Sequence, residues 1–177
     1  MRVRFLFSSR HTKKIDVHNQ HRQEYPALAK EVIAASDIVL EVLDARFIKD
    51  TRNFELENYA REHGKLLVYI INKIDLVDVE KLEASDELEG LQPFVYLSTL
   101  THRGRGQLRD AIKIQAKRFA RTKKTAPPPT PDDYENLEIH KHGIGYTKFL
   151  KVGTQVHIGV IGYPNVGKSS IINMLTG

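Results

Sequence analysis

A glycine-rich loop between an apolar strand and an apolar helix constrains the fold of this chain more than any other feature. The loop, Gly162-Tyr163-Pro164-Asn165-Val166-Gly167-Lys168-Ser169, matches the phosphate-loop pattern G-x-x-x-x-G-K-[ST] in full. Residues 156–161 before it are apolar and β-branched enough to form a buried strand. Residues 171–175 after it are mostly apolar, which predicts a helix that begins at the loop. These flanks favour a phosphate site over a glycine-rich structural turn.

The residue types in this loop suit an anion. Gly162 and Gly167 let the backbone turn so that successive N–H groups converge on phosphate oxygens. Lys168 adds a point charge that can reach the β and γ phosphates, and Ser169 offers a hydroxyl to Mg²⁺. The helix directs the positive end of its dipole at the anion. The expected nucleotide contacts in this segment are Pro164, Asn165, Val166, Gly167, Lys168, Ser169 and Ser170.

A second motif, Asn72-Lys73-Ile74-Asp75, follows the buried strand that is predicted over residues 66–71. Ligands of open parallel sheets bind beyond the carboxyl ends of the strands, where this motif would lie. The Asp75 carboxylate can accept hydrogen bonds from the N1–H and 2-amino groups of guanine, a donor pair that adenine lacks. Lys73 is expected to pack its stem over the base, and Asn72 to tie this loop to the phosphate loop. The alternative is a charged turn between a strand and a helix.

Two further strand ends carry polar residues. Ser98-Thr99-Leu100 follows the short strand predicted over 93–98. Asp44-Ala45-Arg46 follows the strand predicted over 38–44. We interpret Asp44 and Arg46 as strand-end electrostatics rather than as catalytic groups.

The motifs resemble those of GTPases, but their order along the chain is reversed. In an ordinary GTPase the phosphate loop precedes the guanine-recognition motif N-K-x-D, whereas here it follows. The chain therefore resembles the circularly permuted GTPases that assist ribosome assembly, which also carry a D-A-R element. The resemblance implies GTP or GDP as the ligand. It also implies that backbone N–H groups of Ser98, Thr99 and Leu100 contact the guanine carbonyl, although Thr99 replaces the usual alanine.

The resemblance also concerns cations and turnover. Several similar GTPases use an asparagine at the position of Asn165 to hold K⁺ beside the phosphates, and the alternative is that Asn165 only tolerates a tight turn. The family continues beyond the phosphate loop with a switch segment and a D-x-x-G segment that places water. Neither is found in this sequence. We therefore expect a piece of a longer GTPase rather than a degenerate binder, and a chain that does not itself hydrolyse GTP.

The alternation of elements predicts an α/β fold with three layers. Strands are predicted over 38–44, 66–71, 93–98 and 156–161, and helices over 22–36, 53–63, 78–89 and 106–121. The resemblance implies a parallel sheet in the order 156–161, 38–44, 66–71, 93–98, permuted and incomplete, with 156–161 at an edge that invites pairing with another chain. The expected organisation is a basic segment over 1–21 and a partial GTPase domain over 22–177, with a proline-rich linker at about 125–131.

Composition and charge narrow the function classes. The 177 residues contain no cysteine, which excludes a disulfide framework and fits a reducing cytoplasm. No apolar stretch approaches the roughly 20 residues of a membrane helix, so a cytoplasmic location is expected. Nine Lys or Arg residues stand between Arg103 and Lys124 against one acid, Asp110. Four of the nine recur at intervals of four on one helix: Arg109, Lys113, Lys117 and Arg121.

That basic stripe is either a solvated helix face or a surface that contacts the phosphates of ribosomal RNA. Histidines 11, 18, 21, 140 and 142 lack the neighbouring ligands of a metal site and are predicted to be surface residues. Two other functions stay open: a P-loop ATPase or nucleotide kinase in which Asn72–Asp75 is incidental, and an RNA-binding assembly module without nucleotide turnover.

Overall fold

The structure of the chain is a computed structural model, and it describes residues 3–7, 25–125 and 156–176. The strands are β1 (Val3–Phe7), β2 (Ile38–Asp44), β3 (Leu66–Asn72), β4 (Phe94–Leu97) and β5 (Val156–Ile161). The helices are α1 (Tyr25–Ala35), α2 (Ile48–Thr51), α3 (Phe54–Glu62), α4 (Val79–Glu83), α5 (Arg105–Thr125) and α7 (Lys168–Thr176). Two 3₁₀ turns, η1 (Ile74–Leu76) and η2 (Asp86–Leu88), complete the described elements.

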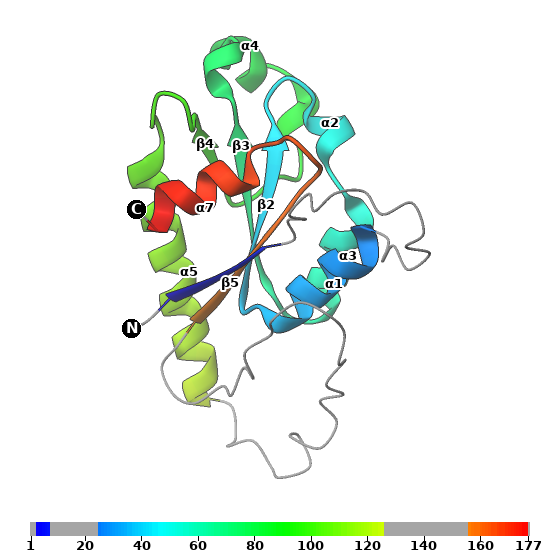
Figure 1. Ribbon diagram of the computed structural model, residues 1–177, viewed down its shortest axis with the longest axis vertical. Helices are drawn as coiled ribbons and strands as arrows, with labels where there is room; N and C mark the ends of the chain where they lie inside the picture. Colours follow the sequence, from blue (N-terminus) through cyan, green and yellow to red (C-terminus); the bar gives the residue numbers. More distant parts are fainter. Residues whose placement is uncertain (1–2, 8–24, 126–155, 177) are drawn as a thin grey trace, which may run out of the picture.

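The strands form one parallel sheet in the order β1-β5-β2-β3-β4 (Figure 1). The predicted order of the last four strands is confirmed. The prediction that β5 lies at an edge is wrong, because β1 pairs with its outer side from Val3↔Val156 to Phe7↔Val160. The sequence predicts residues 3–7 as part of the basic segment over 1–21 and assigns no strand to them. Their sequence, Val-Arg-Phe-Leu-Phe, is rich in strand-forming residues, and β5 offers a complete row of backbone partners.

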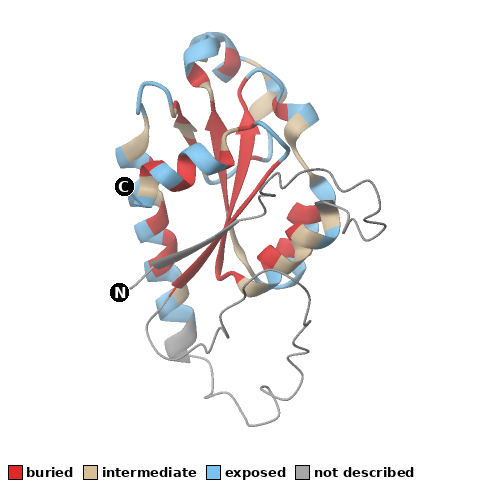
Figure 2. Ribbon diagram, in the orientation of Figure 1, coloured by how far each residue is buried: buried red, intermediate tan, exposed pale blue. Residues whose placement is uncertain are grey.

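Helices cover both faces of the sheet, as the predicted three-layer architecture requires. Residues of α1 and α3, including Ile33 and Leu56, pack with Val39 and Ile161 on one face. On the other face α5 and α7 pack against alternate residues of the same strands, including Val160. Figure 2 shows that the central strands are buried along most of their length. The continuous apolar runs in the sequence follow from this burial on two faces.

The helix predicted over 78–89 is instead two short pieces, α4 and η2. The side chain of Asp78 accepts a hydrogen bond from Glu80 N at 3.1 Å and caps α4. The Ser85 hydroxyl accepts one from Glu87 N at 3.3 Å and caps η2. A residue that caps one turn interrupts the helix before it, because its side chain competes for the backbone N–H groups.

Candidate functional site

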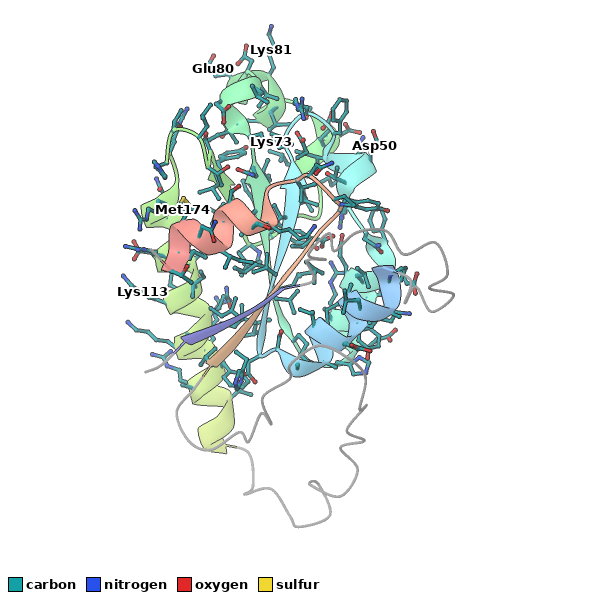
Figure 3. All side chains as sticks on the ribbon, in the orientation of Figure 1. Asp50, Lys73, Glu80, Lys81, Lys113 and Met174 are labelled. Atoms are coloured by element: carbon teal, nitrogen blue, oxygen red, sulfur yellow. The ribbon has the colours of Figure 1, made fainter. Side chains whose placement is uncertain are left out.

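The predicted motifs meet at one edge of the sheet, beyond the carboxyl ends of four parallel strands. β5 leads into the phosphate loop, β3 into the guanine-recognition motif, β4 into residues 98–100 and β2 into Asp44-Ala45-Arg46. In Figure 3, Lys73 lies at this edge, close to the loop that leads into α7. The edge beyond the strand ends is where open α/β sheets bind ligands.

Asn72 joins three of these segments. Its side chain is fully buried, and its Nδ2 donates to Val166 O of the phosphate loop at 2.8 Å. Its Oδ1 accepts from Thr99 N at 3.3 Å. A Cβ added at Gly167, which has φ +103°, would collide with Asn72 Nδ2. The predicted tie between the guanine-recognition motif and the phosphate loop is therefore present, and it requires glycine at position 167.

Lys73 adds a second link to the phosphate loop. Its Nζ donates to Asn165 O at 2.7 Å and lies 2.8 Å from Asp44 Oδ2. Lys73 and Asn165 both adopt left-handed backbone conformations, each with φ of 64°. Such a conformation is uncommon outside glycine, although asparagine tolerates it better than most residues. The two residues with left-handed backbone conformations are thus the two that join the loops through a hydrogen bond.

Asp75 is paired with the segment that follows β4. The Ser98 hydroxyl donates a short hydrogen bond to Asp75 Oδ1, and it accepts one from Thr101 N at 3.1 Å. Ser98 is buried, whereas Asp75 is exposed and Leu100 is 79% exposed. The carboxylate is therefore oriented by the protein while it remains accessible to a ligand.

The phosphate loop folds around its own lysine. Lys168 Nζ donates to Gly162 O at 2.7 Å and to Tyr163 O at 2.6 Å. Burial lowers the pKa of the Lys168 ammonium, because a charge is less favourable away from water. Gly162 has φ +138°, and a Cβ there would collide with Val42 O. The lysine holds the loop in its turn through carbonyl groups.

The two serines that follow this lysine lie at the surface. Ser169 and Ser170 are exposed in the first turn of α7, where Ile171 N donates to Gly167 O at 3.0 Å. Pro164 and Asn165 are also exposed, whereas Val166 is buried against the core. The structure therefore brings every predicted phosphate-loop residue to the carboxyl edge, and leaves the polar ones accessible except for Lys168.

Sequence reasoning did not find the partner of the Lys73 ammonium. It assigned Lys73 to the base alone and gave Asp44 no specific contact. The signal was the position of both residues: Asp44 pairs in register with Asn72 at the ends of neighbouring strands, so Lys73 lies one residue beyond it. Ala45 N also donates to Asn72 O at 2.8 Å, which extends the pairing past the strand ends.

Several sequence predictions fall outside the described residues. These are the five histidines at 11, 18, 21, 140 and 142, and the proline-rich linker beyond residue 125. The division into segments 1–21 and 22–177 stays a prediction. Among the described helices, none has the length and apolar character that would be needed to cross a membrane.

Comparison with known proteins agrees with the motifs. Residues 157–177 match the family described as 50S ribosome-binding GTPase. The chain is 35% identical over 150 residues to an uncharacterized GTP-binding protein of Methanocaldococcus jannaschii, covering 85% of the chain and 31% of that protein. It is 40% identical over 147 residues to human guanine nucleotide-binding protein-like 3, covering 82% of the chain and 26% of that protein.

A third relative is the nuclear GTP-binding protein NUG1 of Saccharomyces cerevisiae, which is 34% identical over 156 residues. That match covers 87% of the chain and 27% of NUG1. The chain thus spans about a third or less of the length of these relatives. Its phosphate-loop strand lies beside β2, although the guanine-recognition motif precedes it in the sequence. The motif order, the strand order and these matches show that the chain belongs to the circularly permuted GTPases of the type that includes guanine nucleotide-binding protein-like 3 and NUG1.

Proposed function

We propose that this chain binds GTP and GDP at the carboxyl edge of the sheet. The observation that carries the proposal is the buried Asn72 amide, which contacts both the phosphate loop and the segment after β4. An ATPase in which Asn72–Asp75 is incidental gives no reason for a buried amide to join these segments. The base lies against Lys73, Asp75 and residues 98–100, and the phosphates lie in the loop over residues 162–170.

Each group has a chemical role in this proposal. Asp75 accepts from the guanine N1–H and 2-amino groups. Of the predicted backbone donors to the guanine carbonyl, Ser98 N donates to Arg103 O at 3.0 Å and Thr99 N to Asn72 Oδ1 at 3.3 Å. We therefore assign this contact to the Leu100 N–H. Lys168 moves from the loop carbonyls to the β and γ phosphates, where its charge lowers the free energy of the bound anion. Mg²⁺, when bound, compensates phosphate charge. The exposed Ser169 hydroxyl fits it as one oxygen ligand among phosphate oxygens and water.

Asn165 is the residue for a K⁺ ion in this proposal. Its side chain is exposed on the phosphate loop, so its amide oxygen is accessible to a cation near the phosphates. Its backbone has φ of 64°, which also supports the alternative that asparagine serves the turn. Hydrolysis of GTP is proposed for the whole protein and not for these 177 residues.

Affinities for GTP, GDP, ATP and ADP on one sample of the chain test the nucleotide class. A site that contacts guanine as described discriminates GDP from ADP by about 100-fold or more, because adenine leaves the Asp75 carboxylate unpaired. Equal affinities would contradict the proposal and favour the P-loop ATPase or nucleotide kinase.

The partner proposed for this family member is ribosomal RNA or a ribosomal subunit, in the cytoplasm or another compartment where ribosomes assemble. Four cations of α5 support it: Arg109, Lys113, Lys117 and Arg121 are all exposed. The opposite side of the helix is buried through Leu108, Ile112 and Ala116. In Figure 3, Lys113 points away from the sheet. The stripe is therefore accessible to an extended polyanion.

Electrophoretic binding to ribosomal RNA tests this surface. Lys113→Gln with Lys117→Gln should weaken binding and reduce the slope of log affinity against log salt by roughly 1 to 2. Lys49→Gln with Lys81→Gln is the matched control, since both lysines are exposed on other helices. Equal effects of the two pairs would indicate a solvated face. RNA binding without any nucleotide binding would favour the assembly module without turnover.

A further inference from the structure

The carboxylate of Asp44 lies between two cations at the end of β2. Arg46 donates through Nε to Oδ1 at 3.0 Å and through Nη2 to Oδ2 at 2.8 Å. Lys73 Nζ lies 2.8 Å from Oδ2. The Asp44 side chain is 6% exposed, whereas that of Arg46 is 41% exposed. A nearly buried carboxylate is thus fixed from one side by a planar two-point pair and meets the Lys73 ammonium on the other.

Asp44 is held in its charged form. Arg46, followed by Lys73, keeps the pKa of Asp44 well below its usual range. Glu41 on the same strand shows the opposite balance: burial and the neighbouring Glu57 raise its pKa to about 8, although Asn53 N donates to its carboxylate at 3.0 Å. The contrast shows that the environment of Asp44 is built for a carboxylate anion.

The Lys73 ammonium is bound at two points. It donates to Asn165 O at 2.7 Å and pairs with Asp44 at 2.8 Å, so one nitrogen joins the end of β2 to the phosphate loop. The side chain of Lys73 is 25% exposed. A lysine stem whose ammonium is fixed in this way follows one path, and little rotamer entropy remains to be lost when a base packs on it.

We propose that Asp44 is a positioning residue. It anchors the Lys73 ammonium, so that before nucleotide binds the lysine stem already follows the path on which the base will pack. Arg46 orients the Asp44 carboxylate. The inference rests on the proposed guanine-nucleotide function. Arg46 and Lys73 together carry one more charge than Asp44, so the anchor adds no net negative charge near the phosphates. Asp44 contacts neither base nor phosphate in this account and acts through Lys73.

A double-mutant cycle tests the anchor. Asp44→Asn should weaken GDP affinity about tenfold, because the ammonium loses a charge-assisted partner. In the Lys73→Met background, which keeps the stem without the ammonium, the same substitution should change affinity less than about twofold. Asp50→Asn, at an exposed position in α2, is the matched control and should leave GDP affinity unchanged. Equal losses in both backgrounds would overturn the proposal, because Asp44 would then act only on the fold.

A second readout needs no nucleotide. In the chain without nucleotide, the Lys73 ¹⁵Nζ resonance should be protected from fast proton exchange, and Asp44→Asn should remove that protection while thermal unfolding confirms a folded chain. Retained protection in Asp44→Asn would overturn the anchor. Loss of protection together with equal GDP and ADP affinities in the unsubstituted chain would retain the anchor and contradict the guanine assignment, so the two failures are distinguishable.

Discussion

The proposed site has two halves that the protein holds differently. The base half consists of residues 72–75 and 98–100, and the phosphate half consists of residues 162–170. In the base half, Asn72, Lys73 and Asp75 each bond to another segment, so the loops proposed to face guanine are ordered by contacts of the protein itself. In the phosphate half, Lys168 instead donates to carbonyl groups of its own loop. In the proposed site, the base half is thus held by the protein without ligand, whereas in the phosphate half Lys168 would have to exchange its bonds to carbonyl groups for bonds to phosphate.

This difference assigns separate tasks to the two halves. A preformed surface loses little entropy on binding, and mismatched bases leave its polar groups unpaired, so it supports discrimination. A lysine that leaves two carbonyl groups gains only the difference between those bonds and the phosphate contacts. We expect substitutions in the base half to change specificity or stability, and substitutions in the phosphate half to change affinity alone.

The largest expected effect is on base specificity. Asp75→Asn should weaken GDP binding by about 100-fold or more and improve binding of xanthosine diphosphate, because an amide can donate to the xanthine O2. Stability should not change, since Asp75 is exposed. Titration with both nucleotides measures the switch, and Asp86→Asn, at another exposed carboxylate, is the control. Unchanged GDP affinity would remove the guanine assignment from the base half.

The next effect is on the phosphate half. Lys168→Ala should weaken GDP and GTP by roughly 10- to 100-fold, since one charge-assisted contact is lost. The free energy of unfolding should change by no more than about 1 kcal/mol, because removing a buried ammonium relieves its desolvation cost and so offsets the loss of its bonds to Gly162 O and Tyr163 O. Calorimetry and chemical denaturation on the same samples measure the two quantities. A large loss of stability would show that both halves are structural and would break the comparison.

Asn72→Ala should lower stability and affinity together. It removes a buried amide, which leaves Val166 O and Thr99 N without that partner, at a cost of about 1 to 3 kcal/mol of unfolding free energy. GDP affinity should fall about tenfold, because the two halves are no longer held together by the Asn72 side chain. Asn58→Ala, at an exposed position in α3, is the control. An affinity loss at unchanged stability would show that the base half is not preformed by Asn72.

The smallest expected effect concerns the cation. In the whole protein, GTP hydrolysis should be faster in K⁺ than in Na⁺ at equal ionic strength, and Asn165→Ala should abolish the difference. The reason is that a cation beside the phosphates neutralises charge that develops during transfer. Initial rates of phosphate release in the two salts measure it. If the rate difference between K⁺ and Na⁺ persists in Asn165→Ala, Asn165 does not bind K⁺ and serves only the turn.

The parts of the molecule that followed from local sequence were predicted well. Mostly apolar runs identified β2, β3 and β5, because burial on both faces favours apolar side chains, with Glu41 and His157 as buried exceptions. A short apolar run also identified β4, whose residues alternate between buried and partly buried. Their order came from the resemblance and is confirmed. The strand β1 was missed, since five residues with one arginine among them carry little pattern and their pairing depends on a distant partner.

The site divides in the same way. The motifs identified Asn72, Asp75 and Lys168, and the link from Asn72 to the phosphate loop is present. Their contacts with nucleotide stay predictions. The Asp44–Lys73 pair was not found because it depends on strand register, which the sequence does not state. The carbonyl partners of Lys168 depend on the turn of the loop, which glycine permits and tertiary contacts select.

The central place of β5 has a consequence for how the chain folds as it is made. β2, β3 and β4 can pair in order of synthesis, whereas β5 is the last described strand along the chain and inserts between β1 and β2. Until it emerges, β2 has an unpaired side and β1 has no strand to pair with. Closing such distant pairings is slow, and exposed strand edges favour aggregation. With the motifs in this order, the unpaired edge of β2 therefore stays exposed to aggregation until β5 has been synthesised.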